Sequence, residues 1–402
     1  MSDIFEKLLA AVPGAKRAQQ GVLFPLEDGG VFHLQGIISD KEMKGLTQDE
    51  TFFLAFCSKN EILRLRSLNT CHDYLLHIRA MSIVDEARLC RVFRHRKTKF
   101  KQWSLSKYYD SKIAAKHLYI HGLPLRLSKI IRPMASGLAM IKEPNASCRN
   151  SVLGTVVVVS ESLEYLLYFM NLGFYGPRLG IPPENVLPSL AIALRILLGV
   201  ESLDFDLDPR GKIPNHIDHQ IKRLTLYQMA FIYGHEYSHH LLGHLVPDSL
   251  DSLLTQNNFT PLNFSGSNSI NYQQEFDADY FSIMHIENNK KLQQNLTLSA
   301  IHLFEYFDFL DAILFKFNKK KIFNSLTHPS HSDRVTNLIN RLDSSTRPDP
   351  SHLADLHSVS NDLREILISS INENSKANLL DMYGSVYLPT YINKPKRDRI
   401  DF

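Results

Sequence analysis

The sequence has few cysteines and no close pair of them. Four cysteines occur in 402 residues, and none forms a C-x-x-C pair. This argues against a disulfide framework and against a zinc site built from cysteine pairs, and it suits a reducing compartment. The first residues carry acids early and have no long apolar core, so we expect no signal peptide. Together these absences predict a cytoplasmic protein.

Long apolar runs and a strong net charge are also missing. No run reaches the roughly 18 uncharged apolar residues of a membrane span. The closest candidates, 187–200 and 300–317, are interrupted by charged residues, so we expect no transmembrane segment. The net charge is only +3, and the chain as a whole therefore has no strong electrostatic attraction to nucleic acid.

The length and the order of the local patterns predict three parts. A chain of 402 residues is too long for one typical core. Strand-like and helical segments are mixed up to a Pro-Asn-Ala-Ser stretch near 145, and helical patterns predominate after it. We predict an N-terminal mixed α/β domain over 1–145, a main domain over 146–345, and C-terminal helices with a basic tail over 346–402. The expected fold class is α+β and predominantly helical.

Local patterns place several elements. A short amphipathic helix begins the chain, and an Asp-Gly-Gly turn predicts a hairpin of strands at 22–26 and 31–38. The valine run at 151–160 predicts a buried strand, and a helix capped by Ser160 or Ser162 follows it. Further helices are expected at 187–200, 219–245, 271–286, 297–318 and 331–342, and a linker at 346–351.

A basic and aromatic segment covers 88–116. Arginines and lysines are frequent from Arg88 to Lys101, and aromatic residues are interleaved with them. Charge supplies affinity for a phosphate backbone and rings stack on bases, so a nucleic-acid interface is one hypothesis. A solvated basic surface is the simpler hypothesis, and it is favoured because no known nucleic-acid module surrounds the segment.

Three alternate aspartates resemble the start of a calcium-binding loop. They are Asp204, Asp206 and Asp208. Such a loop needs glycine at its sixth position and a glutamate at its twelfth. These positions hold Pro209 and Asn215, so we reject a calcium site.

The most informative stretch runs from 227 to 245 and contains the pattern H-E-x-x-H at 235–239. Residues four apart lie on the same face of a helix, so His235 and His239 can both face one zinc ion. Glu236 lies beside that point, where it can take a proton from a zinc-bound water. Two solvated histidines on a polar face are the alternative. The flanking residues are apolar on most sides, which predicts burial, and buried polar groups need partners that a metal provides.

A third ligand is expected from a second helix. Catalytic zinc usually has three protein ligands and one open position. In the segment 271–286, Glu275 and Asp279 are four residues apart and share one helical face. Glu275 can reach the ion, and Asp279 can accept the second N–H of a ligand histidine and so fix its tautomer. A solvated acidic face is the alternative, and the apolar residues around the pair disfavour it.

The other nearby histidines are not expected to join this metal. His244 lies about 140° from His239 on a continuous helix, and it pairs in spacing with His240 on a different face. We expect both to be exposed or hydrogen-bonded elsewhere. The arrangement H-E-x-x-H-x-x-G-x-x-H is excluded, because Leu242 and Leu245 occupy its last two positions.

Three motifs in this order resemble the gluzincin metallopeptidases of the HtpX and CAAX-prenyl-protease type. Besides H-E-x-x-H, those enzymes carry a helix with E-x-E-A-D, matched here by 275–279 with Asp277 in place of the middle glutamate. They then carry T-H-P-x-x-x-x-R, matched by 327–334, and often a histidine nine residues after the first ligand, the position of His244. The resemblance covers roughly 150–342.

The resemblance implies a zincin-like metallopeptidase domain that holds one Zn²⁺ ion and hydrolyses a protein or peptide substrate. The ligands would be His235, His239 and Glu275. The general base would be Glu236, which would activate the zinc-bound water. Members of this family are often membrane-embedded, and this chain is similar to them without the spans.

The resemblance also implies roles for two residues of the third motif. His328 and Arg334 would close over the site, where they would help to hold Asp279 or the transition-state oxyanion.

Two alternative functions stay open. The ImmA/IrrE-type regulators and the Lit-type peptidases also use H-E-x-x-H, which would make the protein a regulatory peptidase acting on one specific cellular protein. A non-catalytic regulatory protein with a structural zinc site is the other alternative.

Overall fold

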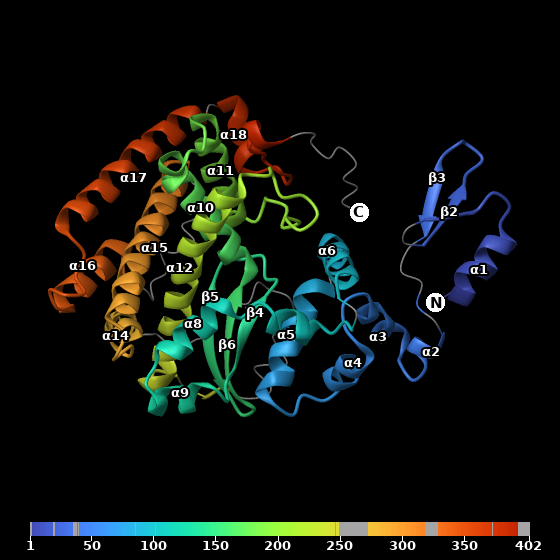
Figure 1. Cartoon of the computed structure of the whole chain (residues 1–402), viewed down its shortest axis with the longest axis horizontal. Coiled ribbons are helices and arrows are strands. Elements are labelled where there is room, and N and C mark those ends of the chain that lie inside the picture. The colour runs from blue at the N-terminus through green and yellow to red at the C-terminus, as the bar shows by residue number, and fades with distance from the viewer. Residues whose placement is uncertain are drawn as a thin grey trace.

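The protein is predominantly helical, and its strands form two small sheets (Figure 1). This confirms the predicted α+β class. The computed structural model describes residues 2–18, 21–34, 38, 40–84, 86–100, 102–245, 247–248, 272–317, 329–371 and 373–392.

The N-terminal residues form a helix and a small antiparallel sheet. The elements are α1 (Ser2–Ala11), β1 (Lys16–Arg17), β2 (Val22–Pro25) and β3 (Val31–Leu34). In the register of the hairpin, Val22 lies opposite Leu34 and Pro25 opposite Val31. In the turn, the Gly30 N–H donates to the Asp28 carboxylate at 2.8 Å, a bond that favours aspartate in turns. The expected helix and hairpin are present; the second strand is confirmed over 31–34, whereas 35–37 of the predicted range lie outside the described residues.

Short helices occupy the part from 40 to 131. They are α2 (Asp40–Met43), α3 (Gln48–Phe52), the 3₁₀ turn η1 (Phe53–Ala55), α4 (Lys59–Leu65), α5 (Cys71–Val84), α6 (Ala87–Thr98), α7 (Leu105–Asp110), α8 (Ala114–Gly122) and α9 (Leu125–Ile131). Thr47 and Ser58 start α3 and α4 with capping boxes, which satisfy amides that a helix start leaves unpaired. Glu61 of the second box also accepts bonds from the amides of Leu105 and Ser106, and so ties α4 to α7.

The second sheet separates two cores. Its strands are β4 (Ala135–Ala139), β5 (Ala146–Ser151), β6 (Gly154–Ser160) and β7 (Pro247–Asp248), in the order β4-β6-β5-β7. Val157 and Val159 face the main core, whereas Val156 and Val158 face a smaller core under α5. A strand buried on both faces appears in the sequence as an uninterrupted apolar run. The strand predicted at 151–160 is therefore present, although β6 begins three residues later than expected.

The outer strand β4 has its free edge satisfied by two cations. Arg79 Nε donates to the Leu138 carbonyl at 2.8 Å, and Lys116 Nζ donates to the Ser136 carbonyl at 3.0 Å. Backbone groups at a buried strand edge need such partners because they have lost water. A Cβ at Gly137 would lie 2.3 Å from Arg79 Nη2, so a larger residue there would push the Arg79 guanidinium out of its present position.

A long helix, α12 (Asn215–Leu241), organises the rest of the molecule. Helices α8, α10, α14 and α15 and strand β5 pack around it (Figure 1). Ser160 caps α10 by accepting a bond from the Leu163 N–H at 3.2 Å, as predicted. The remaining helices are α10 (Glu161–Tyr175), α11 (Val186–Leu197), α14 (Tyr272–Met284), α15 (Lys290–Lys316), α16 (His331–Arg341), α17 (Pro350–Ser370) and α18 (Glu373–Leu380), with 3₁₀ turns η2 (Pro177–Leu179), η3 (Pro183–Asn185) and η4 (Pro389–Tyr391).

The linker predicted at 346–351 is wrong in its last two residues. Helix α17 begins at Pro350, a residue that fits the first turn because it has no amide hydrogen to pair. Asp349 caps the helix by accepting a bond from the Ser351 N–H at 2.8 Å. The proline and aspartate that suggested a loop are thus the start signal of a helix.

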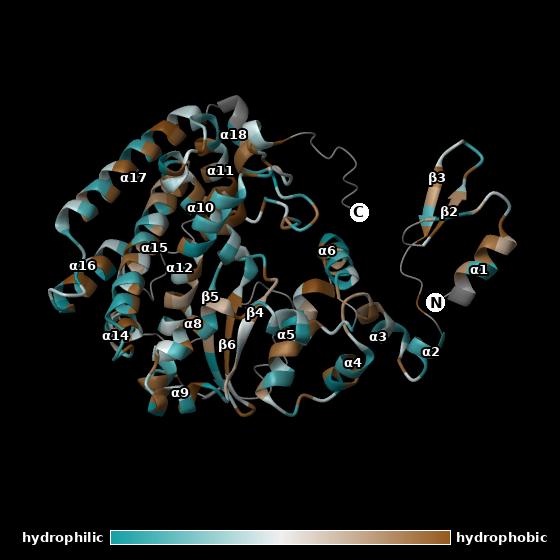
Figure 2. Ribbon diagram, in the orientation of Figure 1, coloured by the Kyte–Doolittle hydropathy of each residue, from teal (hydrophilic) through white to brown (hydrophobic). Residues whose placement is uncertain are grey.

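The basic segment is partly a solvated surface, since Arg91, Arg94 and Lys99 are exposed, but two of its arginines, Arg88 and Arg96, are buried. Helix α6 is mostly hydrophilic (Figure 2), yet its Arg96 is buried. Arg96 binds the two carboxylate oxygens of Glu161 at 2.9 and 2.8 Å and Asp206 at 2.6 Å. The rings of Tyr108 and Tyr109 lie buried beside it. These tyrosines are not available to stack on bases, so the nucleic-acid hypothesis loses their support.

The aspartates of the rejected calcium loop bind arginines. Arg210 is fully buried. Its guanidinium lies 2.8 Å from the Asp204 carboxylate and 3.3 Å from the Asp208 carboxylate. Asp206 is held by Arg96. The charges of the loop are thus neutralised by guanidinium groups, in agreement with the rejection of a calcium site.

Two further findings concern the general organisation. Among the described residues, no helix has the length and apolar character needed to cross a membrane. The second sheet combines β4, which precedes position 145, with β5 and β6, which follow it. The division at 145 and 345 stays a prediction.

Replacing Arg96 by alanine would leave the Glu161 carboxylate buried without its cation. Breaking a buried ion pair from one side costs about 3–5 kcal/mol, and we expect the free energy of unfolding to fall by about that amount in denaturant titrations followed by circular dichroism. Arg91→Ala, at an exposed position of the same helix, is the control and should change stability by less than about 0.5 kcal/mol. Equal stability of the two variants would contradict the role given to the pair.

Candidate metal centre

Helix α12 presents His235 and His239 on one buried face. Their Nε2 atoms lie 3.1 Å apart, and their rings are nearly perpendicular at 83°. Gly234, the residue before the pattern, is packed against α8 so closely that a Cβ would lie 2.3 Å from the Tyr119 ring. The glycine therefore lets the helix approach its neighbour at the point where the histidines emerge.

Helix α14 brings a carboxylate to the histidine pair. Glu275 is 1% exposed, and its Oε2 lies 3.6 Å from His235 Nε2 while its Oε1 lies 3.5 Å from His239 Nε2. One donor atom from each of the three residues falls within 4.8 Å of the others. The residues come from two helices that are separated by more than thirty positions in sequence and pack side by side.

The three donor atoms suit one zinc ion. Zinc binds histidine nitrogen and carboxylate oxygen at about 2.0–2.2 Å in tetrahedral geometry, so neighbouring donors should lie roughly 3.3–3.5 Å apart. The two Nε2 atoms lie 3.1 Å apart, and each lies 3.5–3.6 Å from one of the two oxygens of Glu275, so these separations are close to that value. Two imidazoles and one carboxylate are also a donor set typical of catalytic zinc. The cluster is therefore compatible with one zinc ion.

Asp279 and Arg334 form a second layer of contacts behind His235. Asp279 Oδ1 lies 2.9 Å from His235 Nδ1. Arg334 of α16 donates to both oxygens of Asp279, from Nε at 2.7 Å and from Nη2 at 2.5 Å, and its guanidinium lies 4.3 Å from the centre of the Phe304 ring. An aspartate that accepts the Nδ1–H of a histidine leaves the lone pair on Nε2 free for a metal.

The charges of the cluster favour a cation at its centre. Burial lowers the pKa of His235, but the Asp279 and Glu275 carboxylates outweigh burial and raise it. Burial raises the pKa of Asp279, but Arg334 and His235 outweigh burial and lower it, so Asp279 stays ionised. Burial, together with the neighbouring His235, lowers the pKa of His239 to about 3. His239 is therefore neutral at ordinary pH, the form in which a histidine binds metal.

Glu236, the residue between the two positions of the His235–His239 turn, is 8% exposed. Burial lowers the pKa of Arg334, but the carboxylates of Asp279, Glu275 and Glu236 raise it overall. Burial and then the charge of Glu236 raise the pKa of the Cys148 thiol on β5. The charge of Glu236 therefore acts on Arg334 of α16 and on Cys148 of β5.

The third motif is only partly visible. His328 lies outside the described residues. Arg334 is in place and binds Asp279 at both oxygens, which corresponds to the first of the two roles that the resemblance implied for it. Asp277 binds Arg341 at 2.8 Å.

His244 is closer to the cluster than sequence reasoning placed it. Helix α12 ends at Leu241 rather than at 245, and Gly243 has a left-handed φ of +72°. The chain turns back there, and His244 Nδ1 lies 3.1 Å from His239 Nδ1. The prediction that His244 lies on a different face is wrong, because it assumed a helix that continues. The signal was Gly243, since glycine commonly follows the last residue of a helix.

Comparison with known proteins gives one match. Residues 208–354 match the model of the family described as Peptidase U49. The match covers little more than a third of the chain, but it includes α12, α14, α15 and α16 and with them the whole metal-binding cluster. It supports a peptidase, and hence a protein substrate. No curated protein matches the chain, and no solved structure matches it.

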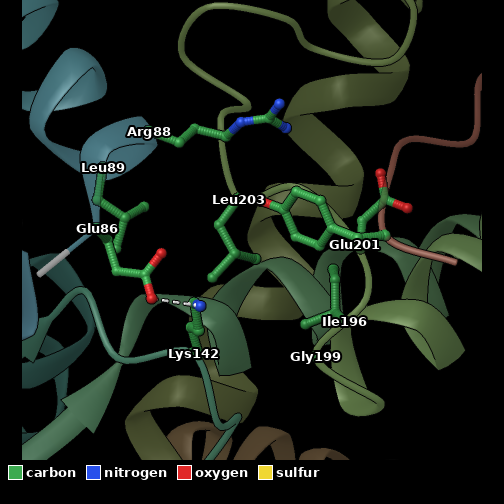
Figure 3. Close-up of a pocket in the computed structure, with 9 residues that line it drawn as sticks. Glu86, Arg88, Leu89, Lys142, Ile196, Gly199, Glu201 and Leu203 are labelled. Atoms are coloured by element: carbon green, nitrogen blue, oxygen red, sulfur yellow. Dashed lines mark ion pairs between the residues drawn. The ribbon is translucent and has the colours of Figure 1, made fainter. Parts of the chain in front are cut away.

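A separate pocket lies near α6 and the end of α11 (Figure 3). Leu89, Leu203 and Tyr383 line it, and the ion pair of Glu86 with Lys142 lies at one side. None of its lining residues belongs to the candidate metal centre. The pocket is therefore distinct from the site that carries the three motifs.

Replacing Asp279 by asparagine would keep its shape but remove the charge that holds His235. Loss of such a partner typically weakens metal binding by about 10- to 100-fold, and we expect that decrease for zinc in competition with a chelator. Asp218→Asn, in the first turn of α12 and paired with Lys222, is the control and should bind zinc as the wild type does. Full zinc affinity in D279N would mean that the Asp279–His235 contact has no part in metal binding.

Proposed function

We propose that the protein is a zinc-dependent endopeptidase, in which His235, His239 and Glu275 hold the ion and Glu236 is the general base. The observation that carries the proposal is the convergence of three donor atoms from α12 and α14 within 4.8 Å, inside the region that matches a peptidase family. The zincin-like character of the domain and its relation to the HtpX and CAAX-prenyl-protease type rest on the three sequence motifs.

A zinc ion at this site would supply a Lewis acid and lower the pKa of a water molecule in its open position. The chain's own groups have separate tasks. Asp279, held by Arg334, keeps the His235 proton on Nδ1. Glu236 accepts the proton of the attacking water and then delivers it to the leaving amine. Because Glu236 is buried, little solvent competes for that proton.

The contacts of Arg334 favour a positioning role over direct contact with substrate. Its Nε and Nη2 bind Asp279, and Nη2 lies 3.6 Å from Glu275. These bonds orient the carboxylates that face the metal site. That the protein acts in the cytoplasm remains a prediction from the sequence.

Glu236→Gln tests the proposed base. Glutamine keeps the size of the side chain but cannot take a proton, and a general base contributes about 10²- to 10⁴-fold to the rate. We expect peptide hydrolysis to fall by that factor while zinc content stays unchanged, and a proteome-wide cleavage search with this variant as reference would identify the substrate. Asp218→Asn, in the first turn of the same helix, is the control with normal activity. Cleavage by E236Q at the wild-type rate would make this mechanism wrong.

Glu275→Ala tests the third ligand. Removing one of three protein ligands should leave the purified protein with little zinc, whereas the wild type should hold about one ion per chain. Metal analysis of both proteins measures this directly. Treatment of the wild type with a chelator should abolish hydrolysis, and added zinc should restore it. Glu287→Gln, just beyond α14 and outside the cluster, should retain zinc. A zinc-replete E275A would remove Glu275 from the ligand set.

A further inference from the structure

The chain beyond α12 returns to the metal site. Gly243 takes a left-handed conformation, and the backbone N–H of His244 donates to the His239 carbonyl at 2.9 Å. On a helix that continued, His244 would lie about 140° from His239. The turn instead places the His244 side chain against the ring of His239, with the ring centres 5.2 Å apart.

The two imidazoles meet through their Nδ1 atoms. These atoms lie 3.1 Å apart, while the Nε2 atom of His239 faces His235 and Glu275. A neutral histidine carries a proton on one ring nitrogen and a lone pair on the other. If Nε2 of His239 is a metal ligand, its proton is on Nδ1, and Nδ1 of His244 is the acceptor that faces it.

We propose that His244 is a positioning residue of the metal centre. It accepts the hydrogen bond from Nδ1–H of His239 and so fixes the tautomer and the ring orientation of that ligand. The inference rests on the metal centre of the proposed function. It gives His239 the kind of support that His235 receives from Asp279, since metal-ligating histidines almost always donate their second N–H to a partner.

The adjacent His240 does not share this role. Its Nδ1 lies 3.2 Å from the Thr155 hydroxyl on β6, so it faces the sheet. His240 and His244 thus stand at the same end of α12 and carry the same side chain, but only His244 contacts a proposed ligand. His240→Ala is therefore a matched control for removal of an imidazole at this end of the helix.

The experiment compares zinc affinity among His244→Ala, His244→Asn, His240→Ala and Glu275→Ala, in full-length protein titrated against a chromophoric chelator. Asparagine can accept a hydrogen bond through its side-chain oxygen, which stands about as far along the side chain as Nδ1 of histidine. We expect about 10- to 100-fold weaker zinc binding for H244A, recovery of most of the affinity in H244N, and wild-type affinity for H240A.

A second readout separates positioning from general stability. The ¹⁵N shifts of the His239 ring report its tautomer, and we expect the Nδ1–H form in the wild type and in H244N but a mixture in zinc-free H244A. A merely structural role would lower the unfolding midpoint of the zinc-free protein without changing the tautomer. Unchanged zinc affinity or an unchanged tautomer in H244A would overturn the inference.

Zinc retention in E275A and H244A distinguishes an error in the role of His244 from an error in the proposed ligand set. If E275A loses zinc and H244A does not, only the role of His244 is wrong. If E275A retains zinc, the proposed ligand set itself is wrong.

Should H244A fail to fold, Gly243→Val and Gly243→Asn replace it, because valine is strained at positive φ whereas asparagine tolerates it. Weak zinc binding by G243V alone supports the proposal, and equal binding by both overturns it.

Discussion

Buried polar groups must be paired, and the surroundings of α12 follow from that constraint. Two histidines, Glu275 and Asp279 lie in a core that is otherwise apolar, where an unpaired polar or charged group costs several kcal/mol. Helix α14 supplies both carboxylates, and α16 supplies Arg334 as the cation for Asp279. The donor atoms of His235, His239 and Glu275 lie within 4.8 Å of one another, an arrangement compatible with a divalent cation between them. Helix packing, charge balance and the proposed chemistry are thus consequences of one pairing requirement.

Buried arginines hold the framework around this site in the same manner. Arg96 joins α6 to the start of α10 through Glu161. Arg195 of α11 donates to backbone carbonyls at Asn378 and Leu379, and so fastens the C-terminal segment. Arg210 gathers the carboxylates of the loop that precedes α12. These contacts join segments far apart in sequence, and guanidinium groups suit the task because each offers several donors in a rigid plane. They keep both ends of the scaffold that carries α12 in place.

Elements with a strong local signal were predictable, and those that depend on distant partners were not. The valine run of β6 and the cap at Ser160 could be read directly, because burial and capping leave a pattern in neighbouring residues. The burial of Arg96 in the basic segment could not be predicted, since composition does not reveal that it has Glu161 as a buried partner more than sixty positions away. The linker before α17 was misjudged for a local reason: Asp349 and Pro350 are typical of turns and of helix starts alike.

The sequence alone determined which donors are available on α12, because the spacing of His235 and His239 and the geometry of a helix place them on one face. It also determined that Glu275 and Asp279 share a face of a second helix. Only the tertiary structure decided that this face meets the histidines, since the approach of α14 to α12 depends on packing across the whole core. It likewise decided the place of His244. Gly243 signals locally that the helix can end there, but only the tertiary structure shows that the turn brings Nδ1 of His244 to within 3.1 Å of Nδ1 of His239.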